Sequence, residues 1–531
     1  MAGVLPANVS FFMQRLAGVS SSHFKISPQG STEATANKII RFELPSNTLL
    51  NFRNVRLFFN AETEGSSAGG RLPNKIDSLI ERVAVYMGGV LVQNNFNHYN
   101  VLRHAKDAIQ GSKCPAVHGH PEIVRETSYH DGTSFVALAN EAYTGTDDMF
   151  CIDYFEGLMG SIEPSIIDTG LLPQITLEIT LAEDAVCPAC EGIFLAVGDG
   201  TGATGTIDKK SGTAATYKLT NLSLQVEVLG LATSVLDQLV ESRIASVGYL
   251  SLPFKNYYTY SSTSNAGGTT RFSANSASVD RIWFAHRNTN YATTPNGVHS
   301  VKGYKLQNGL VRVASATKDG STSAKVVAFD AFAGDTPKVG DFVSGAVTAG
   351  ASMSRITSVD SATQVTVADN ITFADNVNVE FLRDMGLPQF DVGGVLETNK
   401  EKYISKYFRF QEELSGSAPA KYQLQVNGAS LPAYKMNRNE FYEITKASAD
   451  VYRPDKEMSL AQFIDSYYVF CMRFNLEGSD MTRLASGLDT RAVSAQMAYE
   501  TEGTSSQKLD IFVETTAELR VGSGRSIEVI A

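Results

Sequence analysis

The sequence predicts an all-β protein built from two tandem copies of one antiparallel β-sandwich. Residues 81–93 (ERVAVYMGGVLVQ) and 421–432 (KYQLQVNGASLP) share one pattern, an alternating strand, a glycine-containing turn and a second extended segment. Each copy lies within its own half of the 531-residue chain. A single hydrophobic core stops growing near ~250 to 300 residues. We therefore expect two or three domains, of which two are related.

Apolar and polar residues alternate in several segments of the first half. Because successive side chains on a strand point to opposite faces, a period of two indicates one buried and one solvated face. The apolar positions of these segments are Ile40, Phe42 and Leu44; Val55, Leu57 and Phe59; Val83, Val85 and Met87; Ile175, Leu177, Ile179 and Leu181; and Leu222, Leu224, Val226 and Val228. They predict half-buried antiparallel strands.

The second half repeats this alternation and ends in a predicted hairpin. Its apolar positions are Ile282 and Phe284; Tyr422, Leu424 and Val426; and Leu509, Ile511 and Val513. Near the C-terminus, Leu519 and Val521 precede a Gly-Ser-Gly turn that leads to Ile527 and Val529. Two short alternating segments joined by such a turn predict a terminal hairpin.

Few segments have helical spacing. Residues 234–243 begin with Ser and Asp three positions apart and predict a short capped helix, placed in a linker over residues 233–246 between the two halves. Residues 101–109 have apolar side chains at helical spacing, and residues 459–464 open with a Ser-x-x-Gln capping box. Such short helices are expected to cover loops or the ends of the sandwiches.

Composition excludes several classes of function. The formal net charge of −11 argues against a general nucleic-acid-binding protein, which would carry a basic stripe, so no direct nucleic-acid binding is expected. No run of 18 apolar residues predicts a transmembrane span. The first residues lack a basic segment followed by an apolar core, so no secretory signal is predicted.

The five cysteines do not form a disulfide framework, and neither of two small clusters is assigned as a metal site. Cys187 and Cys190 form a lone Cys-x-x-Cys, which lacks the second pair that a zinc site needs. We interpret them as reduced cysteines in a loop between strands. Cys114, His118 and His120 offer three ligands without an acidic fourth partner. A metal at either cluster stays open, and no cofactor is predicted.

No catalytic or nucleotide-binding motif is flanked by the secondary structure that its chemistry requires. The stretch 198–205 (GDGTGATG) matches Gly-x-Gly-x-x-Gly, but a polar segment and then a strand follow it in place of the required helix. We interpret it as a long loop between the last two strands of the first sandwich.

Histidines also lack the setting of an active site. His98, His104 and His130 lie near Asp107 and Asp131, yet no Ser or Cys has a nucleophile signature. We interpret these residues as exposed polar positions in loops. No catalytic, cofactor-binding or metal-binding residue is assigned, and the chain is not predicted to be an enzyme.

One segment interrupts the two-copy pattern. Over residues 298–382 the composition shifts to small and polar residues, and short strand signals recur at 310–313, 325–329, 341–343, 364–367 and 377–381. Bulky strand-like residues return at 403–411. We therefore expect a small β domain inserted into a loop of the second module. The alternative is that these residues are elongated strands of the same sandwich.

The order of these segments resembles the double jelly-roll major capsid proteins of virophages, polinton-like viruses and nucleocytoplasmic large DNA viruses. The segments that carry the resemblance are 39–47 (IIRFELPSN), 53–59 (RNVRLFF), 80–93 (IERVAVYMGGVLVQ) followed by the Tyr99 helix, 281–288 (RIWFAHRN), 407–411 (YFRFQ), 422–432 (YQLQVNGASLP) and 509–521 (LDIFVETTAELRV). The resemblance covers the whole chain except the insert. No single motif is diagnostic, because capsid folds have no catalytic fingerprint.

The resemblance implies two tandem eight-stranded antiparallel jelly rolls. Their expected boundaries are 1–36 for an N-terminal arm, 37–232 for the first jelly roll, 233–246 for the linker helix and 247–531 for the second jelly roll, with the insert at 298–382. It also implies a homotrimeric, pseudo-hexameric capsomer of an icosahedral DNA virus shell, assembled inside the infected host cell and located in the virion.

The expected partners follow from the same resemblance. They are further copies of the chain, within the trimer and in neighbouring capsomers, together with minor capsid and penton proteins. The N-terminal arm is expected under the shell, where it would contact neighbouring capsomers, minor proteins or an internal membrane; a plain disordered tail is the alternative. The inserted domain is expected to project outward.

Two other classes of function are alternatives to a capsid protein. A tandem jelly-roll carbohydrate-binding or carbohydrate-active protein would have paired carboxylates flanked by exposed aromatic residues. The single tryptophan, Trp283, lies within a strand pattern, which disfavours this alternative. A phage tail or fibre protein would show long repeats, which the sequence lacks.

Overall fold

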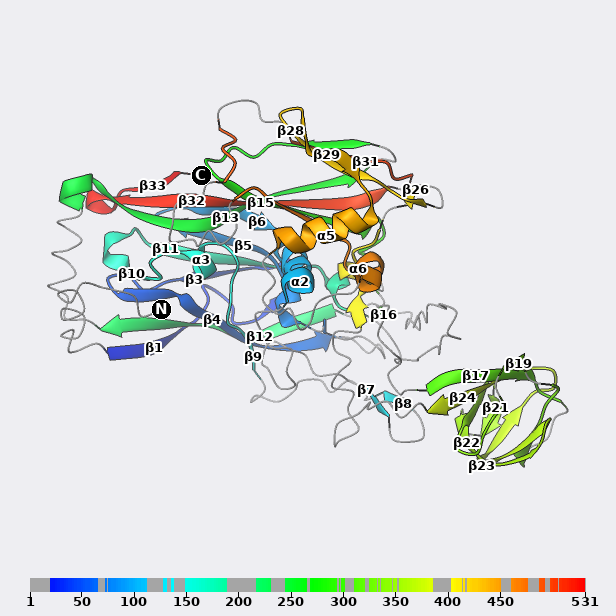
Figure 1. Cartoon of the computed structure of the whole chain (residues 1–531). Coiled ribbons are helices and arrows are strands. Elements are labelled where there is room, and N and C mark those ends of the chain that lie inside the picture. Colours follow the sequence, from blue (N-terminus) through cyan, green and yellow to red (C-terminus); the bar gives the residue numbers. More distant parts are fainter. Residues whose placement is uncertain are drawn as a thin grey trace, which may run out of the picture.

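A computed structural model of the chain shows two stacked β-sandwiches and a smaller β-sheet body (Figure 1). The structure describes residues 20–530, apart from longer gaps at 65–71, 112–127, 131–134, 138–148, 189–215, 231–243, 301–309, 320–323, 385–402, 450–459, 476–486 and 492–496 and several gaps of one to three residues. All structural statements below refer to the described residues.

The first half of the chain forms two antiparallel sheets. Sheet 1A has the strand order β1-β12-β4-β10, with β2 beside β12 and β9 beside β4, and sheet 1B has the order β3-β11-β5-β6. The strands are β1 (Ser20–Ile26), β2 (Ala34–Thr35), β3 (Ile39–Glu43), β4 (Leu49–Glu64), β5 (Ile80–Met87), β6 (Val90–Asn97), β9 (Phe150–Ile152), β10 (Ile166–Asp168), β11 (Ile175–Leu181) and β12 (Thr216–Gly230).

The second half repeats this arrangement. Sheet 2A has the order β13-β32-β15-β30, with β33 beside β32, and sheet 2B has the order β14-β31-β28-β29. The strands are β13 (Tyr249–Ser264), β14 (Thr269–Phe272), β15 (Val279–Asn288), β28 (Tyr422–Val426), β29 (Ala429–Met436), β30 (Val469–Arg473), β31 (Met497–Thr501), β32 (Gln507–Gly522) and β33 (Ile527–Ile530).

Both halves have the topology of a jelly roll. When the eight principal strands of each half are numbered along the chain, sheets 1A and 2A both contain strands one, eight, three and six in that order. Sheets 1B and 2B both contain strands two, seven, four and five. This double-sheet Greek-key order closes an eight-stranded sandwich. The predicted fold class, two tandem antiparallel jelly rolls, is therefore confirmed.

The duplicated sequence pattern marks the same hairpin in both jelly rolls. In the β5–β6 hairpin Met87 pairs with Val90, and in the β28–β29 hairpin Val426 pairs with Ala429. Both two-residue turns have positive φ angles, 57° and 83° at Gly88 and Gly89 and 52° and 78° at Asn427 and Gly428. Positive φ at both central positions is characteristic of the turn that matches the twist of paired strands, and Gly and Asn tolerate it best.

Helices are short and follow corresponding strands. Helix α2 (Tyr99–Gln110) follows β6, and α5 (Arg438–Ser448) follows β29. The remaining helical elements are α3 (Leu158–Ser161), α6 (Leu460–Ser466), and the 3₁₀ turns η1 (Ile76–Leu79), η2 (Thr169–Leu171), η3 (Asp184–Val186), η5 (Lys406–Phe408) and η7 (Ser523–Arg525). The predicted helices at 101–109 and 459–464 correspond to α2 and α6, while the Ser459 cap lies outside the described residues.

The inserted body is a separate β-sheet between β15 and β28 of the second jelly roll. Its order is β18-β23-β22-β20-β24-β17-β19, with β21 beside β23. A bridge between Lys318 and Phe329 joins the ends of β17 and β18, so the sheet curls back on itself. The strands are β17 (Leu310–Thr317), β18 (Ala324–Ala328), β19 (Ala333–Gly334), β20 (Phe342–Gly345), β21 (Val347–Gly350), β22 (Met353–Ser361), β23 (Gln364–Phe373) and β24 (Asn378–Asp384).

Three two-stranded pairs complete the described strands. They are β7 (Ser128–His130) with β8 (Phe135–Ala137), β16 (Val298–Ser300) with β25 (Tyr403–Ser405), and β26 (Leu414–Ser415) with β27 (Ala418–Pro419). The β16–β25 pair flanks the insert, since Ser300 pairs with Tyr403. The insert therefore leaves and re-enters the second jelly roll at adjacent points.

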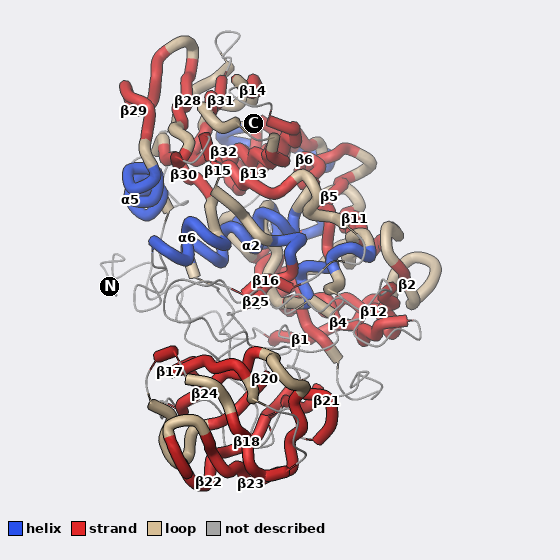
Figure 2. The backbone as a smooth tube through the Cα atoms, turned by 90° about the vertical axis from the view of Figure 1, so that its right-hand side faces the viewer, coloured by secondary structure: helices blue, strands red, loops and turns tan. Residues whose placement is uncertain are grey.

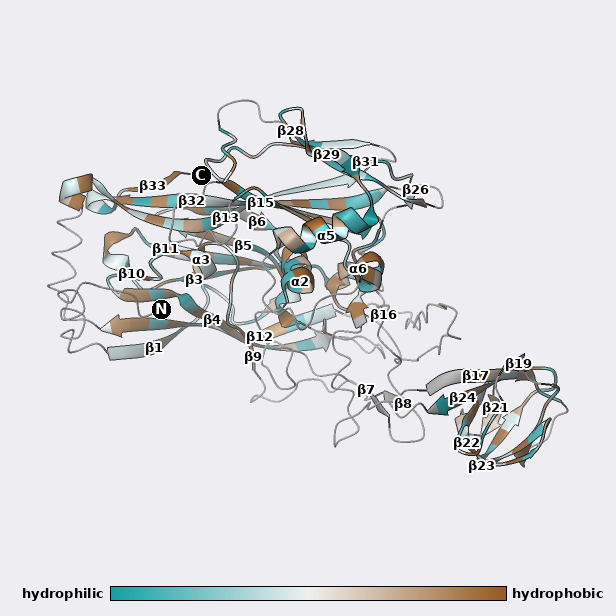
Figure 3. Cartoon of the chain, viewed as in Figure 1, coloured by the Kyte–Doolittle hydropathy of each residue, from teal (hydrophilic) through white to brown (hydrophobic). Residues whose placement is uncertain are grey.

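Two hydrophobic cores fill these bodies. One continuous cluster of buried residues runs through both jelly rolls, and a second, separate cluster that includes Val343, Val365 and Phe381 fills the insert. In Figure 1 sheet 2B lies at the top and is followed by sheets 2A, 1B and 1A. Figure 3 shows apolar residues recurring along the strands of these layers.

The predicted N-terminal arm contains two strands, and the predicted linker helix is largely outside the described residues. Residues 1–36 were expected to form an arm without strands, but β1 and β2 lie within them, and β1 pairs with β12 along its whole length. The expectation was wrong because β1 (SSSHFKI) is an exposed edge strand and therefore lacks apolar alternation. The predicted helix at 234–243 lies outside the described residues, and only residues 244–247 are seen to be helical.

The segment 403–411 also departs from expectation. It was predicted to be strand-like throughout, yet only β25 is a strand, and η5 follows it directly. Ser405 initiates this 3₁₀ turn, because its side chain accepts a hydrogen bond from the Tyr407 backbone. The turn buries Tyr407 and Phe408.

Candidate functional site

Most of the clusters considered for metal or nucleotide binding lie outside the described residues. These are Cys114, His118, His120 and Cys190, together with the glycine-rich stretch 198–205. Cys187 is described and buried, and burial raises the pKa of its thiol well above the usual value, so it is protonated at neutral pH. Among the described residues, no group of three or more His, Cys, Asp or Glu side chains is placed to hold a metal ion.

His98 and His104 do not lie in exposed loops as expected. His104 is half-buried on α2, where it hydrogen-bonds Ser78 Oγ at 2.6 Å and stacks on Phe408 with ring centroids 3.9 Å apart. Burial lowers its pKa to about 4. The prediction that His104 is an exposed loop residue was wrong, because His104 lies on α2 and other elements pack on both sides of this helix. His98 is half-buried, while Asp131 and the side chain of His130 lie outside the described residues.

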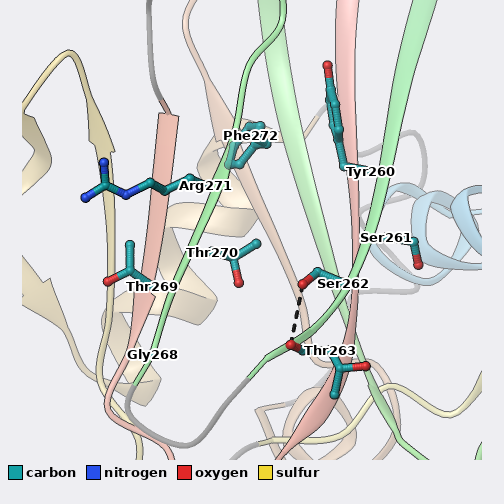
Figure 4. Close-up of a pocket in the computed structure, with 9 residues that line it drawn as sticks. All are labelled: Tyr260, Ser261, Ser262, Thr263, Gly268, Thr269, Thr270, Arg271 and Phe272. Atoms are coloured by element: carbon teal, nitrogen blue, oxygen red, sulfur yellow. Dashed lines mark hydrogen bonds between the residues drawn. The ribbon is translucent and has the colours of Figure 1, made fainter.

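A polar pocket lies beside the start of the second jelly roll. It has a volume of about 440 Å³ and is lined by the ends of β13 and β14, including Tyr260, Ser262, Thr270 and Arg271 (Figure 4). Ser262 Oγ donates a hydrogen bond to the Thr263 carbonyl at 3.4 Å. The lining offers hydroxyl groups and one guanidinium, and it lacks a carboxylate, so it cannot supply the paired acids of a glycosidase.

The most extensive arrangement of polar side chains is the joint between the two jelly rolls. Sheet 2A has one face on its own core, where Ile511 and Val513 are buried, and an outer face toward the first jelly roll. On the outer face Tyr257 pairs with Glu514, and Trp283 with Phe512. These four residues are only 0 to 3% exposed. The outer face of sheet 2A is therefore a buried surface within one chain.

Lysine 106 of α2 is the centre of a charged cluster in this joint. Its Nζ lies 3.0 Å from Glu156 Oε2, 3.1 Å from Tyr257 Oη and 3.9 Å from Glu514 Oε2. The Trp283 indole also donates to Glu514 Oε2 at 3.3 Å. Burial would raise the pKa of Glu514, but the charges of Lys106 and other nearby cations outweigh it and hold this pKa below its usual value. The cluster therefore contains ionised groups from both jelly rolls.

A second charged group joins β32 to the start of α2. Arg287 donates to Asp510 from Nε at 2.9 Å and from Nη2 at 2.5 Å. His98 of the first jelly roll lies between Glu81, at 2.7 Å, and Asp510, at 3.9 Å. Burial opposes ionisation of Asp510, but the charge of Arg287 and the hydrogen bonds from Arg287 and Ser261, together with neighbouring charge, outweigh it and lower the pKa of this carboxyl group.

Stacked rings and backbone contacts complete the joint. Phe96 of β6 stacks on Tyr257 with centroids 4.6 Å apart and planes inclined by 11°. Near α3 the Glu163 backbone N–H donates to the Pro253 carbonyl at 3.0 Å. At the far end of the strands, Arg525 of η7 donates to the Gly170 carbonyl at 2.9 Å and to Asn47 Oδ1 at 3.0 Å. Contacts along the whole length of the two bodies thus fix their relative orientation.

No local pattern in the sequence singles out these residues. In β32 the charged residues Asp510 and Glu514 alternate with apolar ones, a pattern that predicts a solvent-facing side. They are buried because a second body covers that side. The available signal was Trp283 and Phe512, two bulky aromatic residues on a face that was otherwise predicted to be polar.

Comparisons with known proteins were made by sequence and by structure. No model of a known protein family matches the chain, and no curated protein matches it. Solved structures do match. The chain is similar to the PBCV-1 virus capsid, with 12% identity, a TM-score of 0.48 and coverage of 97% of this chain and 98% of that chain.

Two further solved structures are similar over nearly the whole chain. The Faustovirus major capsid protein has 11% identity, a TM-score of 0.47 and coverage of 97% of this chain and 91% of that chain. The Sputnik virophage structure has 9% identity, a TM-score of 0.41 and coverage of 96% and 88%. The jelly-roll assignment itself rests on the strand orders of the four sheets.

Proposed function

We propose that the chain is a structural major capsid protein that forms homotrimeric, pseudo-hexameric capsomers of an icosahedral DNA virus shell. The observation that carries the proposal is the duplication of one jelly-roll topology within a single chain, with both copies fixed by a buried joint. The proposal stands on this duplicated topology.

The duplication is compatible with a capsomer that packs side by side with others in a flat hexagonal array. Three chains with two similar lobes each supply six lobes, and a six-lobed ring has a nearly hexagonal outline that packs without gaps. Such a ring needs a head-to-tail interface that closes after three steps. It also needs lobes that do not swing relative to each other, and the charged and stacked contacts around Lys106 and Tyr257 support that rigidity.

A carbohydrate-binding role has no support in the joint. The single tryptophan, Trp283, is 0% exposed and donates its indole N–H to Glu514, so it cannot stack on a sugar. The buried carboxylates Glu156 and Glu514 are engaged by Lys106. These groups serve the packing of the two lobes, in keeping with a structural role.

The other parts of the chain take places in the shell under the same proposal. The insert would be an outward decoration, because it leaves the body at one paired point, Ser300 and Tyr403. The N-terminal arm predicted over residues 1–36 would contact neighbouring capsomers, minor capsid or penton proteins, or an internal membrane. Within the described residues, no helix is long and apolar enough to cross a membrane.

Light scattering and analytical ultracentrifugation test the central claim. The purified protein should sediment as a trimer or a larger assembly with a defined stoichiometry, and electron micrographs should show particles with a six-lobed outline. A clean monomer at every concentration would contradict the proposal.

Deletion of the insert tests its peripheral role. Because Ser300 pairs directly with Tyr403, a two-residue Asn-Gly turn can replace residues 301–402 and keep the β16–β25 pair as a hairpin. The shortened chain should fold and form the same oligomer as the full chain. Loss of folding would show that the insert belongs to the core of the second jelly roll.

A further inference from the structure

Strands β1 and β13 have the same place in the two jelly rolls. Each is the first strand of its jelly roll and lies at one edge of its sheet, β1 in sheet 1A and β13 in sheet 2A. On one side each strand pairs along its whole length, β1 with β12 and β13 with β32. An edge strand leaves a row of backbone N–H and C=O groups without a strand partner on its other side. The two strands differ in what covers that free edge.

The free edge of β13 is covered by helix α3 and the residues that follow it. Ser161, the last residue of α3, accepts a hydrogen bond on its hydroxyl from the Lys255 backbone N–H at 2.8 Å. Just after α3, the Glu163 backbone N–H donates to the Pro253 carbonyl at 3.0 Å. A segment that comes before β13 in the chain therefore satisfies two backbone groups of this edge strand.

Among the described residues, β1 has no such cover. Within them its free edge has no strand beside it, and no backbone hydrogen bond joins β1 to a segment other than β12. Figures 1 and 2 both show β1 in the layer of the first jelly roll that lies farthest from the second, so sheet 2A does not reach it. Another segment is needed to cover this edge.

Phe24 shows that apolar surface is open at the same edge. It lies on the core side of sheet 1A, opposite Val226, which is fully buried in the hydrophobic core. Phe24 itself is 52% exposed. Burial of apolar surface is favourable, so a segment with apolar side chains of its own would be stabilised at this position.

Residues 1–19 lead directly into β1, and their sequence has the pattern of an amphipathic helix. Pro6 and Gly18 stand where proline commonly begins and glycine commonly ends a helix. The polar residues Ser10 and Gln14 fall on the side opposite to the apolar ones. The apolar residues recur every three or four positions, as on one side of a helix: Leu5, Val9, Phe12, Leu16 and Val19.

We propose that residues 6–17 form an amphipathic helix that packs its apolar side on Phe24 and covers the free edge of β1 in the same chain, as α3 covers the free edge of β13. A helix that turns back at Gly18 runs beside β1. Val9 then lies about 12 Å from the end of the helix and Phe24 about 13 Å from the start of the strand, so the two are level. Phe12 is one turn away from Val9 on the same side.

The charge of the segment favours this protein surface over a lipid surface. Helices that lie on membranes are usually rich in lysine and arginine on their polar side. Residues 1–19 contain one charged side chain, Arg15. The polar side, with Ser10 and Gln14, faces outward, where the contacts proposed for the arm in the capsid would be made.

Hydrogen exchange measured by mass spectrometry on the full-length protein tests the contact from both sides. Val9→Ser/Phe12→Ser changes the helix, Phe24→Ser changes the strand, and a third protein combines all three substitutions. Gln14→Ser, on the polar side of the helix, is the control for the first variant. Tyr434→Ser is the control for Phe24→Ser, because Tyr434 is a 50% exposed aromatic residue of β29 in the other jelly roll.

In the wild type the amides of residues 6–17 should exchange at least about tenfold more slowly than those of an unstructured chain. The helix variant should speed exchange in β1 by about tenfold, and Phe24→Ser should speed exchange in residues 6–17 by a similar factor. The combined protein should match the faster of the two, because both variants remove one shared contact. Both controls should match the wild type.

Unprotected amides over residues 6–17 in the wild type would overturn the inference, as would variants that leave exchange in the opposite segment unchanged. Protection that rises with protein concentration would overturn it in favour of a second copy. Loss of binding to phosphatidylcholine–phosphatidylserine vesicles in the helix variant, with exchange in β1 unchanged, would overturn it in favour of a membrane. The contact lies within one chain, so a monomeric protein would contradict the proposed function and leave the expected exchange pattern unchanged.

Discussion

Sheets 1A and 2A have the same strand order and opposite surroundings. The outer face of sheet 2A buries Trp283, Phe512 and Glu514 against the first jelly roll. The corresponding face of sheet 1A presents Lys25, Gln225 and Arg56 at its surface. Strand topology alone therefore does not determine whether a sheet face is buried as an internal joint or exposed as a surface. The side chains on that face, and the helix that packs against it, determine which of the two it becomes.

The buried joint is ionic at its centre, and this limits its net contribution to the free energy of unfolding. Removing charges from water costs several kcal/mol per ion, so a buried pair gives little net stability over an apolar contact. Loss of one partner, however, leaves an uncompensated charge. The cluster around Lys106 therefore specifies how the lobes fit, because a displaced arrangement would separate Lys106 from Tyr257 and Glu514 of the other jelly roll.

The largest effect is expected from Lys106→Met. This change removes the cation that lies between Glu156 and Glu514 and should lower the free energy of unfolding by about 3 to 5 kcal/mol. Chemical denaturation followed by tryptophan fluorescence measures it, because Trp283 lies in the joint. Lys446→Met on α5 is the control, and its partly exposed pair with Glu443 predicts a change of at most about 0.5 kcal/mol. An equal loss of stability in both variants would contradict this prediction, because Lys106 would then contribute no more than a partly exposed lysine.

The next effect is a dependence of stability on pH, through one histidine in each jelly roll. Burial lowers the pKa of His104 and of His286 to about 4, while His in an unfolded chain titrates near ~6.5. Between these values the unfolded state binds more protons, so the free energy of unfolding falls as the pH decreases from 6.5 toward 4. Each residue should contribute up to about 1.4 kcal/mol per pH unit in this window, or about 3 kcal/mol for each residue over the whole window.

Denaturation curves from pH 7.5 to 4.5 measure this dependence. His104→Gln and His286→Gln should each reduce the slope by about half of the two-histidine contribution. His286→Gln should also cost stability at pH 7.5, because His286 hydrogen-bonds Gln507 and Tyr499 at 3.2 and 3.0 Å in the core. Unchanged slopes in both variants would show that other groups control the acid response.

The smallest effects compare the two equivalent hairpin turns. Gly89→Ala and Gly428→Ala should each cost about 1 kcal/mol, because each position has a positive φ and a new Cβ would meet nothing within 4 Å. Gly88→Ala should cost more, since its Cβ would lie 2.8 Å from Pro173 Cβ. Thermal unfolding of the three variants provides the ranking. Equal losses at all three positions would show that Pro173 moves away freely.

Much of the fold could be predicted from local pattern. Alternation located the core strands, including β11, β28 and most of β32, and the Gly-Gly and Asn-Gly turns identified the duplicated hairpin. Strands without alternation were missed, such as the exposed β1 and the polar β22 of the insert. The partner of β1 is the distant β12, so no local pattern could reveal that they pair. Strand β22 pairs with β23, which follows it directly, and β22 was missed because most of its residues are polar.

The joint could not be predicted, because burial of its charges depends on a neighbour distant in sequence. His104 and Lys106 have the spacing of an ordinary amphipathic helix, and nothing local indicates that a second body covers the polar side of α2. Phe408, which stacks on His104, comes from a segment that was predicted to be a strand.

Local patterns predict the class of fold and the duplication, because strand periodicity and turn residues act over a few neighbouring positions. Which of the two equivalent sheet faces is buried depends on packing between distant parts of the chain. That choice depends on contacts such as Lys106 with Glu514 and Phe96 with Tyr257, which join residues more than a hundred positions apart. Periodicity indicates that a strand has two sides, and only packing shows what lies against each of them.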